Sequence, residues 1–294
     1  MGFDVHLVDG TYELFRHYHA LPSHLTADGR EVAAVRGVIG SLLTMVADGA
    51  THVAVATDHV VESFRNDMWA GYKTGEGIPE DLFAQFGLLE DAARAAGFTV
   101  WPMVDGEADD GLATGAVLAA ADPRVDKVLI CTPDKDLAQC VGGRIVQFDR
   151  RKGEIRDTDG VWERFGVAPA SIPDYLALVG DTADGFPGLR GWGAKSTATV
   201  LARYGRLEGI PHDPDDWDIT VRGAAKLAER LVADWEAAVL FRQLATLIRD
   251  SAEVPGGVDD WRWTGPRADF VDIASSLDAP GLVDRAAAAA TGRR

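Results

Sequence analysis

The chain has 294 residues, of which 47% are hydrophobic and 26% charged, and its formal net charge is −17. That length can bury one large core or two modest ones. No apolar run approaches the roughly 18 residues of a membrane span, and the N-terminus has no signal-like core, so we expect a soluble cytoplasmic protein without a membrane segment.

The negative charge argues at first against a nucleic-acid partner, because proteins that bind nucleic acids usually carry basic surface. The alternative is that many of the acids belong to metal sites, whose cations would invert the local sign. Cys131 and Cys140 lie nine residues apart without zinc-site spacing, and we expect both to be buried thiols.

The first half of the chain alternates short apolar runs with alanine-rich helical patterns. The runs that predict strands are 3–8, 52–57, 98–104, 127–132 and 144–148. The helical patterns lie near 31–48, 80–96, 108–121 and 134–140. Nearly continuous apolar strands that alternate with helices predict an α/β fold with a central, mostly parallel sheet flanked by helices.

From about residue 155 the pattern becomes helical. The expected helices are 161–167, 172–180, 195–205 and 224–249, followed by one strand at 259–264 and two short helices. We therefore divide the chain into a core over 1–155 and a helical region over 156–294.

Acidic residues follow each of the first four predicted strands. The third strand leads into "DGEADDG" at 105–111, and two further acids lie in "GDTADG" at 180–185, spaced so that they share a face of one turn. A single acid after a strand is commonly a solvated turn residue or a helix cap. Parallel strands, however, bring all these acids to one edge of the sheet, where ligands bind and where their mutual repulsion accumulates.

Hard divalent cations would offset this repulsion. No histidine or cysteine accompanies the acids, which disfavours zinc and copper and favours Mg²⁺ or Mn²⁺. Two or more ions fit the number of carboxylates, and two ions about 4 Å apart suit in-line attack on a phosphodiester. The predicted metal ligands are Asp9, Asp58, Glu107, Asp109, Asp110, Asp134, Asp136, Asp181 and Asp184.

The segment "FPGLRGWGAKSTA" at 186–198 has the form of a helix-hairpin-helix turn. Gly188, Gly191 and Gly193 would let the backbone approach a phosphate, which the N–H groups of the next helix would bind together with Lys195. By itself such a segment can be an ordinary turn, but its position beside Asp181 and Asp184 favours phosphate binding, which ignores base identity.

Three further residues lie in "SFRNDMWAGYKTGEG" at 63–77. Arg65 or Lys73 could stabilise charge that develops on a scissile phosphate, and Tyr72 could stack on a base. The alternative is an ordinary basic surface loop.

With these motifs in hand, the chain closely resembles the 5′ nuclease family, which includes flap endonucleases, phage 5′ exonucleases and the 5′-nuclease domain of bacterial DNA polymerase I. The resemblance runs in order from about residue 5 to residue 250. It rests on "LVDG", "FRHYHAL", "SFR" with "GYK", "GEADD", "TPDKDL" and "GDTADGFPGLRGWGAKSTA".

The resemblance implies a PIN-like nuclease core and a metal-dependent 5′-3′ exonuclease and flap endonuclease of replication and repair. The nine acids would be the complete metal set, and Lys73 and Arg65 would be the catalytic cations at the base of a helical arch near 65–96. Arg16, Tyr72, Arg190 and the hairpin would contact DNA, and the hairpin would also bind K⁺. Asp105 falls outside the set and is expected to be a solvated turn residue.

The expected substrates are DNA with 5′ flaps, nicks, gaps or free 5′ ends, including RNA-primed strands, and we expect a monomer that is a stand-alone bacterial member of the family. Two other interpretations stay open: a non-catalytic DNA junction-binding module and a PIN-type ribonuclease. The chain also departs from the family pattern at Gly185–Phe186, Trp192 and Glu76.

Overall fold

The computed structural model describes residues 2–292, which form two compact units. The first unit comprises residues 2–61, 75–132 and 248–292, and the second comprises residues 62–74 and 133–247. Each unit is therefore assembled from separate stretches of chain, whereas the sequence analysis divides the chain once, near residue 155.

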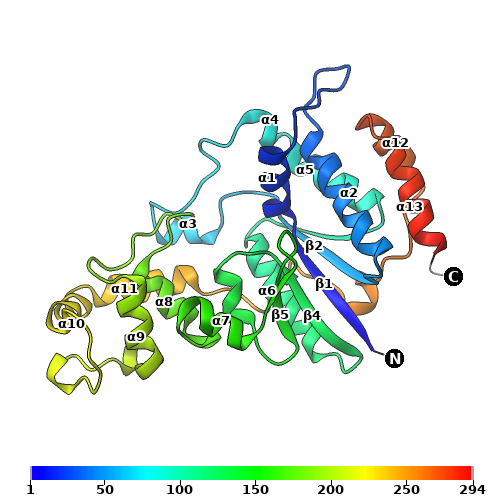
Figure 1. Cartoon of the computed structure of the whole chain (residues 1–294). Coiled ribbons are helices and arrows are strands. Elements are labelled where there is room, and N and C mark those ends of the chain that lie inside the picture. Colours follow the sequence, from blue (N-terminus) through cyan, green and yellow to red (C-terminus); the bar gives the residue numbers. More distant parts are fainter. Residues whose placement is uncertain (1, 293–294) are drawn as a thin grey trace. The chain divides into compact units, whose positions relative to one another are not determined.

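The first unit is built on four parallel strands in the order β3-β2-β1-β4 (Figure 1). They are β1 (Phe3–Asp9), β2 (His52–Asp58), β3 (Thr99–Met103) and β4 (Val125–Cys131). Asp9 pairs in register with Ala56, and Asp58 pairs with Met103, so the carboxyl ends of neighbouring strands meet at one edge. The prediction of a mostly parallel α/β sheet is confirmed.

Helices cover both faces of these strands (Figure 1). One face carries α1 (Gly10–Ala20), α2 (Ala33–Ala47) and α5 (Gln85–Ala95), which pack on one another, and the other face carries α6 (Ala108–Ala121), which contacts all four strands. The unit also contains α4 (Glu80–Phe83), α12 (Phe270–Ser276) and α13 (Gly281–Thr291). Coverage of both faces explains why the middle strands read as continuous apolar runs.

One predicted strand is wrong. Residues 259–264 form no strand; a 3-10 helix, η5 (Val258–Trp261), occupies the start of the range. The Asp260 carboxylate accepts the Gly257 N–H at 2.9 Å and closes a turn, and the Trp261 indole packs edge-on against Trp101 with ring centroids 5.1 Å apart. The tryptophans that suggested a strand are buried, but they lie in and after a turn and not in a strand.

Three helices also differ from expectation. The segment near 80–96 is divided into α4 and α5, and 134–140 contains only the 3-10 helix η1 (Asp136–Cys140). The segment 224–249 forms α10 (Ala224–Ala233) and α11 (Trp235–Ala245), with the break at Asp234. The helix α1 has no counterpart among the predicted elements; its N-cap is Asp9, whose carboxylate satisfies a first-turn N–H group.

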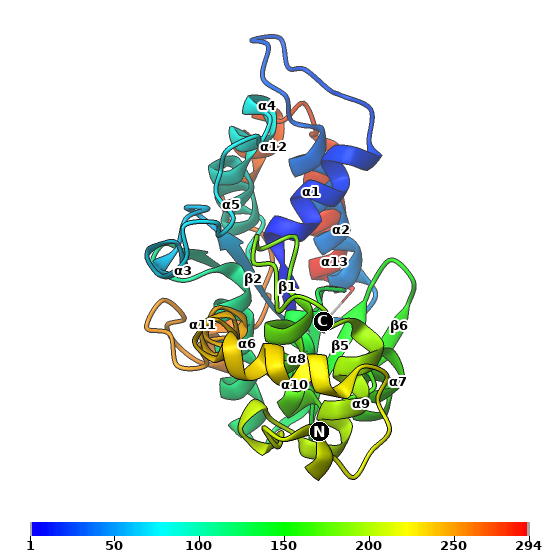
Figure 2. The ribbon, with the colours of Figure 1, turned by 90° about the vertical axis from the view of Figure 1, so that its left-hand side faces the viewer.

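The second unit is helical apart from an antiparallel pair, β5 (Ile145–Asp149) and β6 (Glu154–Arg156). Its longer helices are α7 (Thr158–Phe165), α8 (Ile172–Val179), α9 (Ala194–Tyr204), α10 and α11, of which α8, α10 and α11 are seen most directly in Figure 2. Short elements complete it: α3 (Phe64–Met68), η2 (Pro169–Ser171), η3 (Leu207–Gly209) and η4 (Pro214–Asp216).

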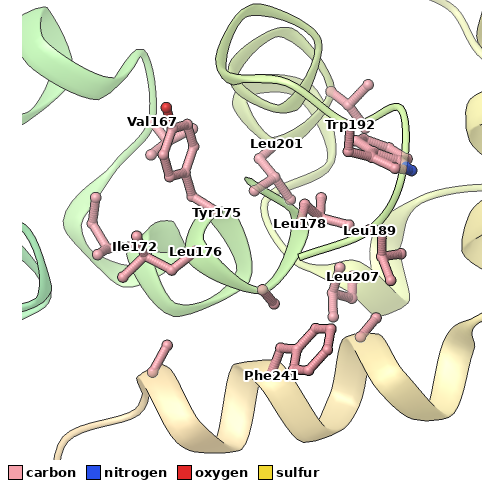
Figure 3. Packing of buried hydrophobic residues seen from close by; sticks show 14 of the residues in the cluster. Val167, Ile172, Tyr175, Leu176, Leu178, Leu189, Trp192, Leu201, Leu207 and Phe241 are labelled. Carbon is pink, nitrogen blue, oxygen red and sulfur yellow. The ribbon is translucent and has the colours of Figure 1, made fainter. Parts of the chain in front are cut away.

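The core of the second unit joins α8, α9 and α11 (Figure 3). Phe241 points from α11 toward Leu207 and α8. Trp192, which lies in the hairpin that joins α8 to α9, packs at the edge of this cluster. Both cysteines of the chain are free and buried, as predicted. Among the described residues, no helix combines the length and the apolar character needed to cross a membrane.

Candidate metal centre and nucleic-acid interface

Asp9 and Asp58 end neighbouring strands of the first unit. Asp9 caps α1: its Oδ1 accepts the Tyr12 N–H at 2.8 Å and its Oδ2 accepts the Thr132 hydroxyl at 2.9 Å. Asp58 Oδ1 accepts the N–H of Ala108, the first residue of α6, at 2.8 Å. The end of β2 is thus tied to the helix that carries the next acids.

The acids of "DGEADDG" lie at the start of α6. Glu107 is the N-cap residue, Asp109 is half-buried in the first turn, and Asp110 is fully buried. Asp110 Oδ2 accepts the Glu107 N–H at 3.0 Å, and its Oδ1 accepts the Ile248 N–H at 2.9 Å. Two backbone donors therefore fix the orientation of Asp110. Asp105 is exposed, which agrees with its predicted role as a turn residue.

Three predicted ligands of the second unit meet at one point. Asp136, Asp181 and Asp184 are all buried, and each offers a carboxylate oxygen within 4.8 Å of the others. Asp134 is exposed and accepts the Asp136 N–H at 3.2 Å through Oδ1. Within residues 2–292 this trio is the one group of three or more metal-ligating side chains that meet so closely.

Burial and the neighbouring carboxylates raise the pKa of Asp136 well above its ordinary value; Asp134, Asp184 and Asp181 all contribute, and Lys135 opposes them. The Oδ1 atom of Asp136 is buried and has no hydrogen-bond partner among the described residues. A buried oxygen without a partner is costly unless a ligand satisfies it. The oxygen-only donor set and this unsatisfied atom both fit a hard divalent cation.

Two lysines offset part of the charge of the trio. Lys135 Nζ lies 2.8 Å from Asp181 Oδ1, and Lys73 Nζ lies 3.2 Å from Asp184 Oδ1. Burial lowers the pKa of Lys135, but its hydrogen bond to Asp181 and the nearby acids outweigh burial and raise it overall. The Lys73 N–H also donates to the Asp184 carbonyl at 3.0 Å, so the backbone and the side chain of Lys73, a predicted catalytic residue, both contact a predicted metal ligand.

The other predicted residues of 63–77 are buried. Arg65 is 1% exposed, and its guanidinium donates to the carbonyls of Leu244 at 2.9 Å and Thr246 at 3.1 Å, just past the point where α11 ends. The Tyr72 ring belongs to the core of the second unit and is 4% exposed. In this structure neither presents the open surface that contact with a phosphate or a base requires, and their predicted roles stay predictions.

Arg16 lies on α1 and pairs with Glu13 of the same helix, with Nε at 3.2 Å from Glu13 Oε2. Its Nη2 also lies 3.3 Å from the His17 ring. The predicted contact of Arg16 with duplex DNA stays a prediction.

The hairpin glycines serve two different purposes. Gly188 has φ +68°, and a Cβ there would lie 2.3 Å from the Gly180 nitrogen, so this glycine is needed for close packing against the end of α8. At Gly191 and Gly193 a Cβ would meet nothing within 4 Å. A ligand could therefore approach the backbone at residues 191 and 193, whereas other backbone atoms block the approach at 188.

The departures from the family pattern have structural reasons. Phe186 and Trp192 are buried; Phe186 stacks with Phe241 at 5.7 Å between ring centroids, and the Trp192 indole N–H donates to the Leu227 carbonyl at 3.2 Å. Gly185 has φ +83°, and a Cβ there would lie 2.1 Å from the Gly71 oxygen. Glycine at 185 thus allows the chain of 62–74 to approach the Asp184 turn.

A basic groove of about 470 Å³ lies between the hairpin and α10. Arg190, Arg222, Lys226 and Arg230 line it, with Glu229 as the one acid. Arg230 pairs with Asp234 at 3.0 Å, whereas the other three cations have no ion-pair partner within residues 2–292. The sequence analysis singled out only Arg190; the spacing of the others at i, i+4 and i+8 is the signal that could have revealed them.

Comparisons with known protein families agree with this architecture. The profile of the 5′-3′ exonuclease N-terminal resolvase-like domain matches residues 4–166, and that of the 5′-3′ exonuclease C-terminal SAM fold matches residues 167–269. The chain is 37% identical over 254 residues to DNA polymerase I of Pseudomonas aeruginosa, which covers 83% of this chain and 27% of the polymerase. For the thermostable DNA polymerase I of Thermus aquaticus the identity is 31% over 314 residues, covering 97% and 37%. The chain thus spans about a quarter to a third of these curated relatives.

Solved structures share the fold. A bacteriophage T5 flap endonuclease in a complex with DNA and metal ions superposes with a TM-score of 0.64 at 21% identity, covering 97% of this chain and 99% of that one. The catalytic core of Rad2 in complex with a DNA substrate gives 0.63 at 15% identity, covering 97% and 92%. These likenesses agree with the observed α/β core and helical second unit, and the two profile matches, which together span residues 4–269, show that the chain belongs to the 5′-3′ exonuclease family.

Proposed function

We propose that this protein is a divalent-metal-dependent 5′ nuclease that hydrolyses phosphodiester bonds in DNA with 5′ flaps, nicks, gaps or free 5′ ends. The observation that carries the proposal is the buried trio Asp136, Asp181 and Asp184, in which one carboxylate oxygen has no hydrogen-bond partner in the described part of the chain. Family membership supports the same conclusion.

In this proposal the carboxylates would hold two or more Mg²⁺ or Mn²⁺ ions, which when bound would lower the pKa of a water and offset the charge of the leaving oxygen. The predicted acidic residues would hold these cations, and Asp110 is fixed in orientation by its two backbone donors. Lys73 Nζ lies 3.2 Å from Asp184 Oδ1. It is the group that would turn toward the phosphate as negative charge develops.

The hairpin and the basic groove would bind the duplex part of the substrate. The open backbone at Gly191 and Gly193 and the three groove cations that have no ion-pair partner within residues 2–292 suit a phosphate backbone, which is bound without regard to base sequence. Lys195 in the first turn of α9 adds a further cation to this surface. The potassium site implied by the resemblance is part of the same proposal at the hairpin.

The decisive experiment compares Asp181→Asn with Asp105→Asn on end-labelled flap, nicked and RNA-primed duplexes in Mg²⁺, Mn²⁺ or EDTA. We expect wild type to cleave only with metal and Asp181→Asn to lose cleavage by at least about 100-fold, because a metal ligand is lost. Asp105 is an exposed aspartate outside the predicted metal set, so Asp105→Asn makes the same chemical change as Asp181→Asn and is the control that should keep wild-type cleavage.

Tight binding of the flap substrate without cleavage in either metal would instead favour the non-catalytic junction-binding module. Cleavage restricted to RNA strands would favour the PIN-type ribonuclease. Equal cleavage by Asp181→Asn and wild type would remove the trio from the mechanism.

A further inference from the structure

Glu253 lies in a short segment, residues 248–253, that follows α11 and packs against the acids of α6; we call it the strap. Three consecutive backbone N–H groups converge on its carboxylate: Val104 at 2.6 Å and Asp105 at 3.2 Å on Oε1, and Gly106 at 2.9 Å on Oε2. A carboxylate that accepts several backbone N–H groups is a strong, charge-assisted anchor.

The anchored residues form the link between β3 and α6. Glu107 directly follows this link. The conformation of the link therefore sets the position of Glu107 and of the first turn of α6. A Cβ at Gly106 would lie 3.3 Å from both Glu253 Oε2 and Asp110 Oδ2. The two carboxylates therefore flank Gly106, one holding the link and the other belonging to the predicted metal set.

The strap makes two further contacts with α6. The Ile248 N–H donates to Asp110 Oδ1 at 2.9 Å, and the Ser251 N–H donates to the Thr114 hydroxyl at 3.1 Å. The Thr114 hydroxyl in turn donates to the Ile248 carbonyl at 3.4 Å. The strap is thus hydrogen-bonded to α6 at Asp110 and Thr114. Through Glu253 it is also hydrogen-bonded to the link that precedes α6.

We propose that Glu253 is a positioning residue for the metal site: its carboxylate holds residues 104–106 so that Glu107, Asp109 and Asp110 are presented to divalent cations. Glu253 does not contact the reacting atoms in this assignment. The inference rests on the proposed function only in assuming that these acids bind metal.

The test uses Glu253→Gln, which keeps the size of the side chain but removes the charge, and Glu253→Ala, which removes the acceptor. The matched control is Asp250→Asn, because Asp250 lies on the same strap, is exposed, and has no hydrogen-bond or ion-pair partner within residues 2–292. Glu253→Gln and Asp250→Asn change the net charge equally.

Two measurements on the whole chain decide the matter. Hydrogen exchange of the metal-free protein should show that the amides of 104–106 lose protection in Glu253→Ala and that at least one of them does so in Glu253→Gln, which keeps a single acceptor oxygen. Mn²⁺ titration followed by electron paramagnetic resonance should show affinity weakened about 10–100-fold in Glu253→Ala and less in Glu253→Gln, as for other partners that orient metal ligands. Asp250→Asn should match wild type in both, and binding of duplex DNA in EDTA should be unchanged in all variants.

The proposal is overturned if the Glu253 variants bind Mn²⁺ as tightly as wild type, if their amides stay protected, or if Asp250→Asn weakens binding as much. Should Glu253→Ala fail to fold in a thermal melt, Glu253→Gln alone decides. These outcomes are distinct from failure of the proposed function, which would appear as a wild-type protein that binds no Mn²⁺ or cuts no flap.

Discussion

At the scale of single residues, the carboxyl group of Asp136, a predicted metal ligand, lowers the stability of the folded protein. Its carboxyl group is buried among other acids, and burial together with their charges raises its pKa. Lys135 contacts Asp181 and Lys73 contacts Asp184, but Asp136 Oδ1 has no hydrogen-bond partner among the described residues. Ionisation of Asp136 therefore costs the folded, metal-free protein free energy, which a bound cation would return.

We predict that Asp136→Asn raises the melting temperature of the metal-free protein by a few degrees at pH 7, since each kcal/mol is worth about 2–4 °C in a chain of this size. A raised pKa favours the folded state below the unfolded value of about 4, and this benefit is lost as pH rises through the folded pKa. The advantage of the variant should thus vanish near pH 4 and grow toward neutral pH.

Melts in EDTA across this pH range measure the effect, and added Mg²⁺ should stabilise wild type but not Asp136→Asn. A variant less stable than wild type at pH 7 in EDTA would mean that the buried carboxylate is not under electrostatic strain.

At the scale of elements, one part of the hairpin between α8 and α9 packs tightly against the rest of the second unit, while another part leaves its backbone exposed. Gly188 faces the Gly180 nitrogen and the Leu178 carbonyl oxygen, at 2.3 and 2.6 Å from the position of a Cβ, so the hairpin is folded tightly onto the end of α8. Trp192 fills the core beneath it. Rigid attachment at 188 and 192 leaves the backbone at 191 and 193 exposed in a fixed position.

We predict that Gly188→Ala lowers the free energy of unfolding by about 2–4 kcal/mol, because the Cβ meets backbone atoms and the φ of +68° is strained for alanine. Gly193 has extended backbone and free space, so Gly193→Ala should change stability by less than about 0.5 kcal/mol. Urea denaturation of both variants provides the comparison. If Gly188→Ala were as stable as Gly193→Ala, the close approach to α8 would not be a constraint.

At the scale of the whole molecule, the net charge of −17 includes the acids of the predicted metal set, and the chain also carries a local basic surface. Nine of the acids are the predicted metal ligands, which cations would neutralise. Arg190, Arg222 and Lys226 line one groove and have no ion-pair partner among the residues that the structure describes. An acidic protein can therefore bind DNA, because the field that a phosphate meets is local and distant charges are screened by salt.

We predict that Arg222→Glu weakens binding of duplex DNA in EDTA several-fold and lowers the slope of log affinity against log salt by about 1, as expected for the loss of one phosphate contact. Arg206→Glu makes the same charge change at an exposed arginine of the second unit outside the groove, and it should leave the slope unchanged. Fluorescence anisotropy over a range of salt concentrations measures both. Equal losses in the two variants would indicate a general charge effect.

The sequence by itself determined the strands and the positions of the acids, because apolar runs, strand–helix alternation and glycine-rich turns depend on neighbours in the chain. Its errors are of one kind. The tryptophans of 259–264 suggested a strand but are buried from a 3-10 helix, and Asp234 divides one long helical pattern into α10 and α11. At 259–264 the packing of Trp261 against Trp101 outweighed the local preference for a strand.

Only the tertiary structure decided which of the predicted site residues lie close together. It gathered Asp136 with Asp181 and Asp184, buried Arg65 against carbonyls 179 and 181 residues away, and brought Glu253 to amides about 150 residues earlier in the chain. Such contacts depend on how distant segments pack, and no local pattern encodes them. The order of strands and acids in the sequence predicts the metal ligands, whereas packing sets the burial of these acids, the pKa of Asp136 and the residues that hold them in place.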